Sequence, residues 1–117
     1  MQKKYTSSAK IFFPKFSKEQ VIEEVGRSAK ELREKLGLEA VILFGSYAKG
    51  SQTAASDIDL LIIFNNEKIS ENEVYKTLMK SIKLPGKELH LIPRSELENY
   101  EKTKWIKTIR EEGIKIL

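Results

Sequence analysis

The stretch LFGSYAKGSQTAASDIDLLIIF, residues 43–64, connects two apolar runs through a polar loop. It holds the only two aspartates of the chain, Asp57 and Asp59, whereas fifteen glutamates are spread over the remaining sequence. The run IDLLIIF, residues 58–64, is apolar almost throughout, which is typical of a strand buried on both faces. Because side chains at positions i and i+2 of a strand point the same way, the sequence predicts both carboxylates on one face.

The segment before this strand has the features of a phosphate-binding bend. The run AVILF, residues 40–44, predicts a buried strand that ends at Gly45, and Ser46 opens a short helical turn that closes on Gly50. Free N–H groups and a hydroxyl at a helix start stabilise an anion, and glycine lets the backbone approach it closely. We therefore predict that Gly45 and Ser46 bind phosphate. Lys49 is either a further phosphate contact or a solvated side chain.

The paired aspartates predict a metal site. Two neighbouring carboxylates repel each other unless a cation lies between them, and oxygen ligands suit Mg²⁺ or Mn²⁺. The short aspartate side chain also holds its carboxylate close to a rigid strand, which a glutamate does less well. Together, the bend and Asp57 with Asp59 predict a site for a metal-bound nucleoside triphosphate that undergoes in-line displacement.

Helical and extended patterns alternate along the rest of the chain. Three capping boxes, in which a serine is followed three residues later by Glu or Gln, predict the starts of the longer helices. These pairs are Ser17 with Gln20, Ser70 with Glu73, and Ser95 with Glu98. Gly37 is predicted to end the first helix, and the second extends to about residue 83. In the third helical segment, the spacing of Trp105 with Leu97 and Ile109 predicts a core position for the tryptophan.

Four apolar runs predict strands, over residues 40–44, 58–64, 88–92 and 114–117. The resulting order is helix, strand, turn, strand, helix, strand, helix, strand. This order predicts an α/β or α+β fold, with a mixed sheet of about four strands and helices packed on it.

Length and composition restrict the possible classes of protein. The 117 residues predict one domain over 1–117, with residues 1–8 flexible and the apolar segment 10–16 at an edge or irregular. The net charge of +4 comes from lysines interspersed with glutamates, which argues against a nucleic-acid-binding stripe. The sequence contains no apolar run of about 20 residues and no cysteine. We therefore expect a cytoplasmic protein without a membrane span, a disulfide or a thiolate zinc site.

The motif Gly45-Ser46, ten intervening residues and Asp57-Ile58-Asp59 resembles the signature of the minimal branch of the polymerase-beta-like nucleotidyltransferase superfamily. The resemblance extends to the order of elements and implies a nucleotidyltransferase fold. It also implies transfer of NMP, most commonly AMP from Mg-ATP, to a hydroxyl. In this scheme Gly45 and Ser46 hold the triphosphate, Asp57 and Asp59 ligate the metal, and Ser56, directly before the pair, joins the nucleotide site.

The resemblance implies a partner as well. Minimal members act beside a helical protein of the HEPN type, as the antitoxin that adenylylates a tyrosine of the toxin. A homo-oligomer is also compatible with the sequence.

This chain departs from the family pattern at the third carboxylate, on the next strand. There His90, the only histidine, stands where the family has an aspartate, and Glu88 lies two residues earlier. Three interpretations follow: Glu88 is a displaced third ligand, His90 is the base, or the site binds nucleotide but transfers it poorly. The last makes the chain an antitoxin-like binding subunit with weak or no catalysis.

Overall fold

The computed structural model describes residues 16–117, and the predictions for residues 1–8 and 10–15 lie outside this range. The elements are α1 (Lys18–Leu36), β1 (Leu38–Phe44), α2 (Ser46–Lys49), β2 (Ile58–Phe64), α3 (Glu71–Ser81), β3 (Lys87–Pro93), the 3-10 helix η2 (Arg94–Glu96), α4 (Leu97–Glu101), α5 (Lys104–Glu112) and β4 (Ile114–Lys115). The predicted order of helices and strands is confirmed.

The four strands form one mixed sheet in the order β3-β2-β1-β4. β1 is antiparallel to both β2 and β4, whereas β2 and β3 are parallel. In this register Asp59 is paired with Phe44 of β1 on one side and with Glu88 of β3 on the other. The predicted mixed sheet of four strands is therefore confirmed, and Asp59 lies near the start of one of its two central strands.

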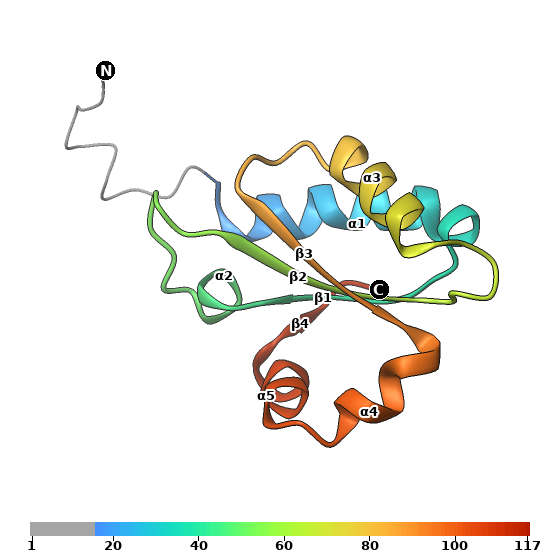
Figure 1. Ribbon diagram of the computed structural model, residues 1–117. Coiled ribbons are helices and arrows are strands. Elements are labelled where there is room, and N and C mark those ends of the chain that lie inside the picture. Colours follow the sequence, from blue (N-terminus) through green and yellow to red (C-terminus); the bar gives the residue numbers. More distant parts are fainter. Residues whose placement is uncertain (1–15) are drawn as a thin grey trace.

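Helices cover both faces of the sheet, with α1 and α3 on one side and α4 and α5 on the other (Figure 1). Successive side chains of β2 pack alternately into the two layers between the sheet and its helices. Leu60 and Ile62 belong to the core shared with α1 and α3. Leu61 and Ile63 pack in a second cluster with residues of α5. Burial on both faces explains why β2 is apolar without alternation.

Two of the three predicted capping boxes mark helix starts. Ser17 and Gln20 exchange both hydrogen bonds at the start of α1, and the hydroxyl of Ser70 accepts from the backbone N–H of Glu73 at α3. The third prediction is wrong, because Ser95 lies in η2 and its hydroxyl accepts a hydrogen bond from Asn66, at 2.9 Å. Thr103 instead caps α5.

The prediction that Trp105 is a core residue is also wrong, because its side chain is 40% exposed. Ile106 and Ile109 form the buried face of α5. Among the described residues, none of the helices combines the length and the apolar character that crossing a membrane requires.

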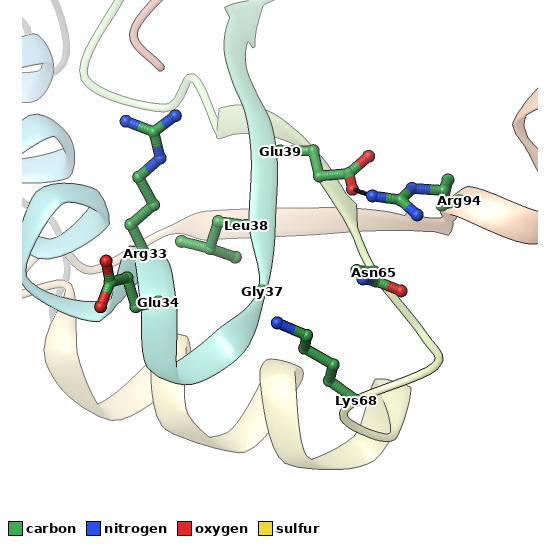
Figure 2. A pocket seen from close by; sticks show the side chains of 8 residues that line it. All are labelled: Arg33, Glu34, Gly37, Leu38, Glu39, Asn65, Lys68 and Arg94. Carbon is green, nitrogen blue, oxygen red and sulfur yellow. Dashed lines mark hydrogen bonds and ion pairs between the residues drawn. The ribbon is translucent and has the colours of Figure 1, made fainter.

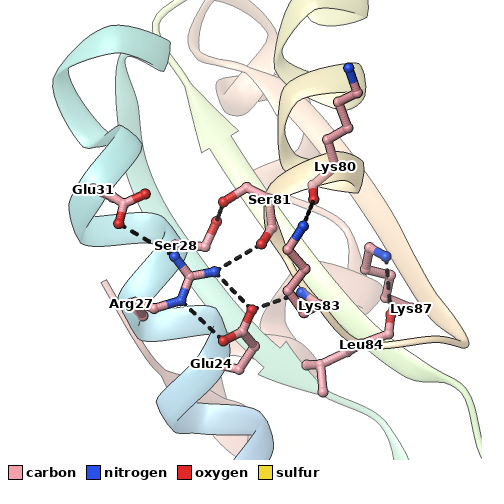
Figure 3. Close-up of polar contacts among 9 residues, drawn as sticks. All are labelled: Glu24, Arg27, Ser28, Glu31, Lys80, Ser81, Lys83, Leu84 and Lys87. Atoms are coloured by element: carbon pink, nitrogen blue, oxygen red, sulfur yellow. Dashed lines mark hydrogen bonds and ion pairs between the residues drawn. The ribbon is translucent and has the colours of Figure 1, made fainter.

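A polar seam joins α1 to the end of α3 (Figure 3). The Arg27 guanidinium donates to both carboxylate oxygens of Glu24, at 3.1 and 2.8 Å, and to the carbonyl of Ser81, at 2.8 Å. The backbone N–H of Lys83 donates to Glu24 at 2.7 Å. The bonds from Arg27, and then that from Lys83, lower the pKa of the Glu24 carboxyl from 4.5 to about 2. Glu24 therefore holds the two helices together in its charged form.

Replacing this carboxylate makes stability depend less on pH. Because the folded-state pKa is depressed, the contribution of Glu24 is complete above pH 4.5 and is lost as the pH falls towards 2. We expect Glu24→Gln to lower the free energy of unfolding by about 1–2 kcal/mol at pH 7. The difference from the unmodified protein should disappear near pH 2.

Urea unfolding at pH 7, 4 and 2.5 measures this difference. Glu31→Gln is the control, because Glu31 is 64% exposed and meets Arg27 only at 3.4 Å. It should change stability by less than about 0.5 kcal/mol. A constant difference between Glu24→Gln and the unmodified protein across this pH range would contradict the assignment.

Candidate active site

Gly45 and Asp59 are in direct contact. The backbone of Gly45 has φ 79° and ψ −154°, a conformation that is essentially restricted to glycine. A Cβ atom at this position would lie 2.6 Å from Oδ2 of Asp59. The carboxylate therefore occupies the space that a side chain at position 45 would need. The structure thus brings the predicted phosphate-binding bend and this predicted metal ligand together.

Around Asp59, acidic groups and the only histidine converge. Nε2 of His90 lies 3.4 Å from Oδ1 of Asp59 and 3.8 Å from Oε1 of Glu88. One ligand atom from each of these three residues lies within 4.8 Å of the others. The sequence predicted Asp59 as a metal ligand and Glu88 or His90 as alternatives at the third position, and the structure places all three in one cluster.

Asp57 lies next to the same cluster, directly before β2. Its negative charge, followed by desolvation and the charge of Asp59, raises the pKa of the Glu88 carboxyl above its usual range. Asp57 and Asp59 therefore repel the charged form of Glu88. Their oxygens are donors that fit a divalent cation, and His90 adds one nitrogen.

Aromatic rings hold the imidazole of His90 on one side. The ring centroid of His90 is 5.2 Å from that of Phe44 and 6.0 Å from that of Trp105. Phe44 and Trp105 meet edge to face, at 6.0 Å. Neither Phe44 nor Trp105 was predicted from the sequence to lie at the site. The signals were the position of Phe44 directly before Gly45 and an aromatic residue at the start of the helix that covers this face.

A hollow of about 400 Å³ opens between the Gly45 bend and α5. Phe44, Gly45 and Trp105 line it, together with Lys49 and Glu112. Its volume lies within the range of small-molecule sites. The cluster around Asp59 and this hollow are neighbours, because Gly45, Phe44 and Trp105 contribute to both.

Two predicted nucleotide contacts have local partners. The Lys49 ammonium lies 3.4 Å from a carboxylate oxygen of Glu112, and both side chains are at least half exposed. The hydroxyl of Ser56 accepts a hydrogen bond from the backbone N–H of Thr53, at 2.9 Å. Ser56 thus stabilises the loop before Asp57. Ser46, by contrast, begins α2 beside the hollow.

A second hollow, of about 590 Å³, lies at the other end of β1, near Gly37 and Asn65 (Figure 2). Both positively and negatively charged side chains line it, and among them Arg94 is paired with Glu39. It contains none of the predicted site residues. The larger hollow of the two is therefore separate from the acidic cluster.

Residues 25–116 match the family model described as "Nucleotidyltransferase domain". The chain is 34% identical over 80 residues to "Putative protein adenylyltransferase MJ1379" of Methanocaldococcus jannaschii, which covers 67% of this chain and 80% of that protein. It is also 34% identical over 84 residues to "Putative protein adenylyltransferase MJ0126" of the same organism, over 68% of this chain and 81% of that protein.

A crystal structure described as a "putative nucleotidyltransferase" from Sulfolobus solfataricus has the same fold, with a TM-score of 0.56 at 18% identity. The match covers 84% of this chain and 80% of that one. The family match includes the Gly45 bend and the acidic cluster. The chain therefore belongs to the nucleotidyltransferase-domain family, as a minimal member.

Proposed function

We propose that this protein transfers AMP from ATP to a hydroxyl group of a partner protein. The observation that carries the proposal is the contact between Asp59 and Gly45, which puts a carboxylate cluster directly beside a phosphate-binding bend. The names of the relatives, protein adenylyltransferases, support AMP as the group and protein as the acceptor.

Each part of the site has a role in this reaction. The N–H groups that begin α2 and the hydroxyl of Ser46 bind the leaving phosphates. Asp57 and Asp59 hold Mg²⁺ or Mn²⁺, which neutralises phosphate charge as a Lewis acid. The acceptor oxygen bonds to the α-phosphorus while the bond to the bridging oxygen breaks, and pyrophosphate leaves. Glu88 or His90, beside Asp59, takes the proton of the acceptor hydroxyl.

The acceptor in this proposal is a tyrosine of a HEPN-type helical partner. A second candidate function is neutralisation of that partner by contact alone. Two observations favour it: an imidazole stands at the third carboxylate position, and Lys49 is paired with Glu112.

Transfer of labelled AMP separates the two candidates. We expect α-labelled ATP to label a HEPN-type partner. Asp57→Asn and Asp59→Asn should each lower the rate at least about 100-fold, because the metal ligands are lost. Glu101→Gln is the control, since Glu101 is partly exposed, is paired with Arg110, and belongs neither to the cluster nor to the lining of the hollow. If both aspartate variants still neutralise the partner and the unmodified protein transfers no label, contact alone is the function.

Trp105 gives a direct readout of nucleotide binding, because it is the only tryptophan and lines the hollow beside Gly45. We propose that the base of ATP stacks on its exposed ring. ATP should then change its fluorescence, and Trp105→Ala should weaken ATP binding about tenfold. Trp105→Phe should restore most of the affinity. Tyr75→Ala is the matched control, since Tyr75 is 44% exposed on α3, on the other side of the sheet. Equal affinities of all variants would exclude stacking.

Gly45 and Gly50 form a matched pair for testing the contact with Asp59. Both have positive φ, 79° and 78°, but nothing lies within 4 Å of a Cβ added at Gly50. Gly50→Ala should cost about 1 kcal/mol of stability through backbone strain and leave AMP transfer intact. Gly45→Ala should also displace Asp59 and lower transfer about 100-fold. Similar losses of transfer in both variants would contradict the role of the contact.

A further inference from the structure

The donor atoms around Asp59 differ from an all-oxygen site. His90 presents Nε2 to Oδ1 of Asp59 at 3.4 Å and to Oε1 of Glu88 at 3.8 Å. Magnesium prefers six oxygen ligands at short distances and gives up its waters reluctantly. An imidazole nitrogen suits zinc, cobalt and other first-row transition ions better. One of the three possible ligand atoms, Nε2 of His90, is therefore a nitrogen where an all-oxygen magnesium site would have an oxygen.

The spacing of these donors fits a shared ion. Two ligands at about 2.0–2.2 Å from one metal, at tetrahedral or octahedral angles, are themselves roughly 3.0–3.5 Å apart. The distance between His90 and Asp59 is 3.4 Å, and that between His90 and Glu88 is slightly longer, at 3.8 Å. The ligand atoms of all three residues lie within 4.8 Å of one another, so the Glu88 side chain, which is 54% exposed, has to turn towards Asp59 to complete the set around an ion.

The imidazole is also oriented before any ion arrives. Phe44 and Trp105 pack against its ring, so its rotation is restricted and Nε2 stays directed at the carboxylates. Ligands whose rotamers are fixed by packing bind an ion with less loss of entropy. The two aromatic rings therefore act as positioning residues for a nitrogen ligand.

We propose that Asp59, Glu88 and His90 bind a first-row transition ion, such as Zn²⁺ or Co²⁺, in preference to Mg²⁺. This inference rests on the proposed function in one respect, because Asp59 is also a ligand of the ion that the proposed transfer uses. It also refines that function. A ligating Nε2 is not free to accept a proton, so His90 is then a ligand and not the base that takes the proton of the acceptor hydroxyl.

Nuclear magnetic resonance of the imidazole tests the inference, because His90 is the only histidine and its signals need no assignment in an untagged, ¹⁵N-labelled protein. Zn²⁺ should shift the ¹⁵N signal of Nε2, and Co²⁺ should broaden the ring protons, at concentrations at least about tenfold below those at which Mg²⁺ binds. Mg²⁺ alone should leave the nitrogen without a ligation shift. Calorimetry with each ion supplies the affinities.

Replacing the nitrogen donor His90 should remove the preference for Zn²⁺ and Co²⁺ over Mg²⁺. His90→Asp should lower the affinity for Co²⁺ and Zn²⁺ about 10- to 100-fold without lowering the affinity for Mg²⁺. His90→Gln should lose the transition-ion preference as well, which covers the case in which the aspartate variant does not fold. Glu101→Gln, as the control for surface carboxylates, should bind each ion as the unmodified protein does.

The alternative role for His90 is that of a charged counter-ion to the carboxylates. In that case Zn²⁺ and Mg²⁺ bind with similar affinity, or Zn²⁺ binds while the Nε2 signal stays in place, and either result overturns the inference. The metal-binding measurements are made without nucleotide, so their result does not depend on AMP transfer. A protein that transfers AMP with Mg²⁺ but shows no ligation by His90 refutes the inference alone, and one that ligates Zn²⁺ but transfers nothing refutes the proposed function alone.

Discussion

The carboxylate of Asp59 lies where a side chain at position 45 would otherwise be, and the rest of the site depends on this contact. β1 ends at Phe44, and the antiparallel register pairs that residue with Asp59, so the bend at Gly45 turns directly beside the acid. Only glycine accepts both the positive φ and the close approach. Because β2 is also parallel to β3, Asp59 has Glu88 as its other neighbour. Asp59, on the central strand β2, therefore joins the predicted phosphate-binding bend to Glu88 and His90.

Aromatic rings border the cluster of Asp59, Glu88 and His90 on the face of the sheet that α4 and α5 cover. On that face of the sheet, apolar residues such as Ile63 continue towards the site and give way to the acids near the start of β2. Trp105 lies at this boundary, in contact with the rings of Phe44 and His90, and is 40% exposed. Its partial exposure follows from its position beside an open site, not from a defect in packing.

The sequence predicted those features that depend on local chemistry. Both caps at Ser17 and Ser70, the two central strands and the bend at Gly45 follow from residue types within a few positions of each other. Features that depend on distant contacts were missed. Ser95 bonds to Asn66, which is 29 residues away and prevents it from capping a helix. The contact of His90 with Asp59, which spans 31 residues and requires the parallel register of β2 and β3, was expected only through the family resemblance, because composition alone does not determine that register.

The cost of this arrangement bears on the choice between an enzyme and a contact-only subunit. Asp57 and Asp59 repel Glu88, as the raised pKa of the Glu88 carboxyl indicates. Gly45 adopts its positive φ without steric cost, so the cost of the site is this electrostatic repulsion. A protein that acts only by covering a partner gains nothing from clustered like charges beside the predicted phosphate-binding bend. Binding of a cation offsets this repulsion, so the electrostatics of the site favour nucleotidyl transfer over contact alone.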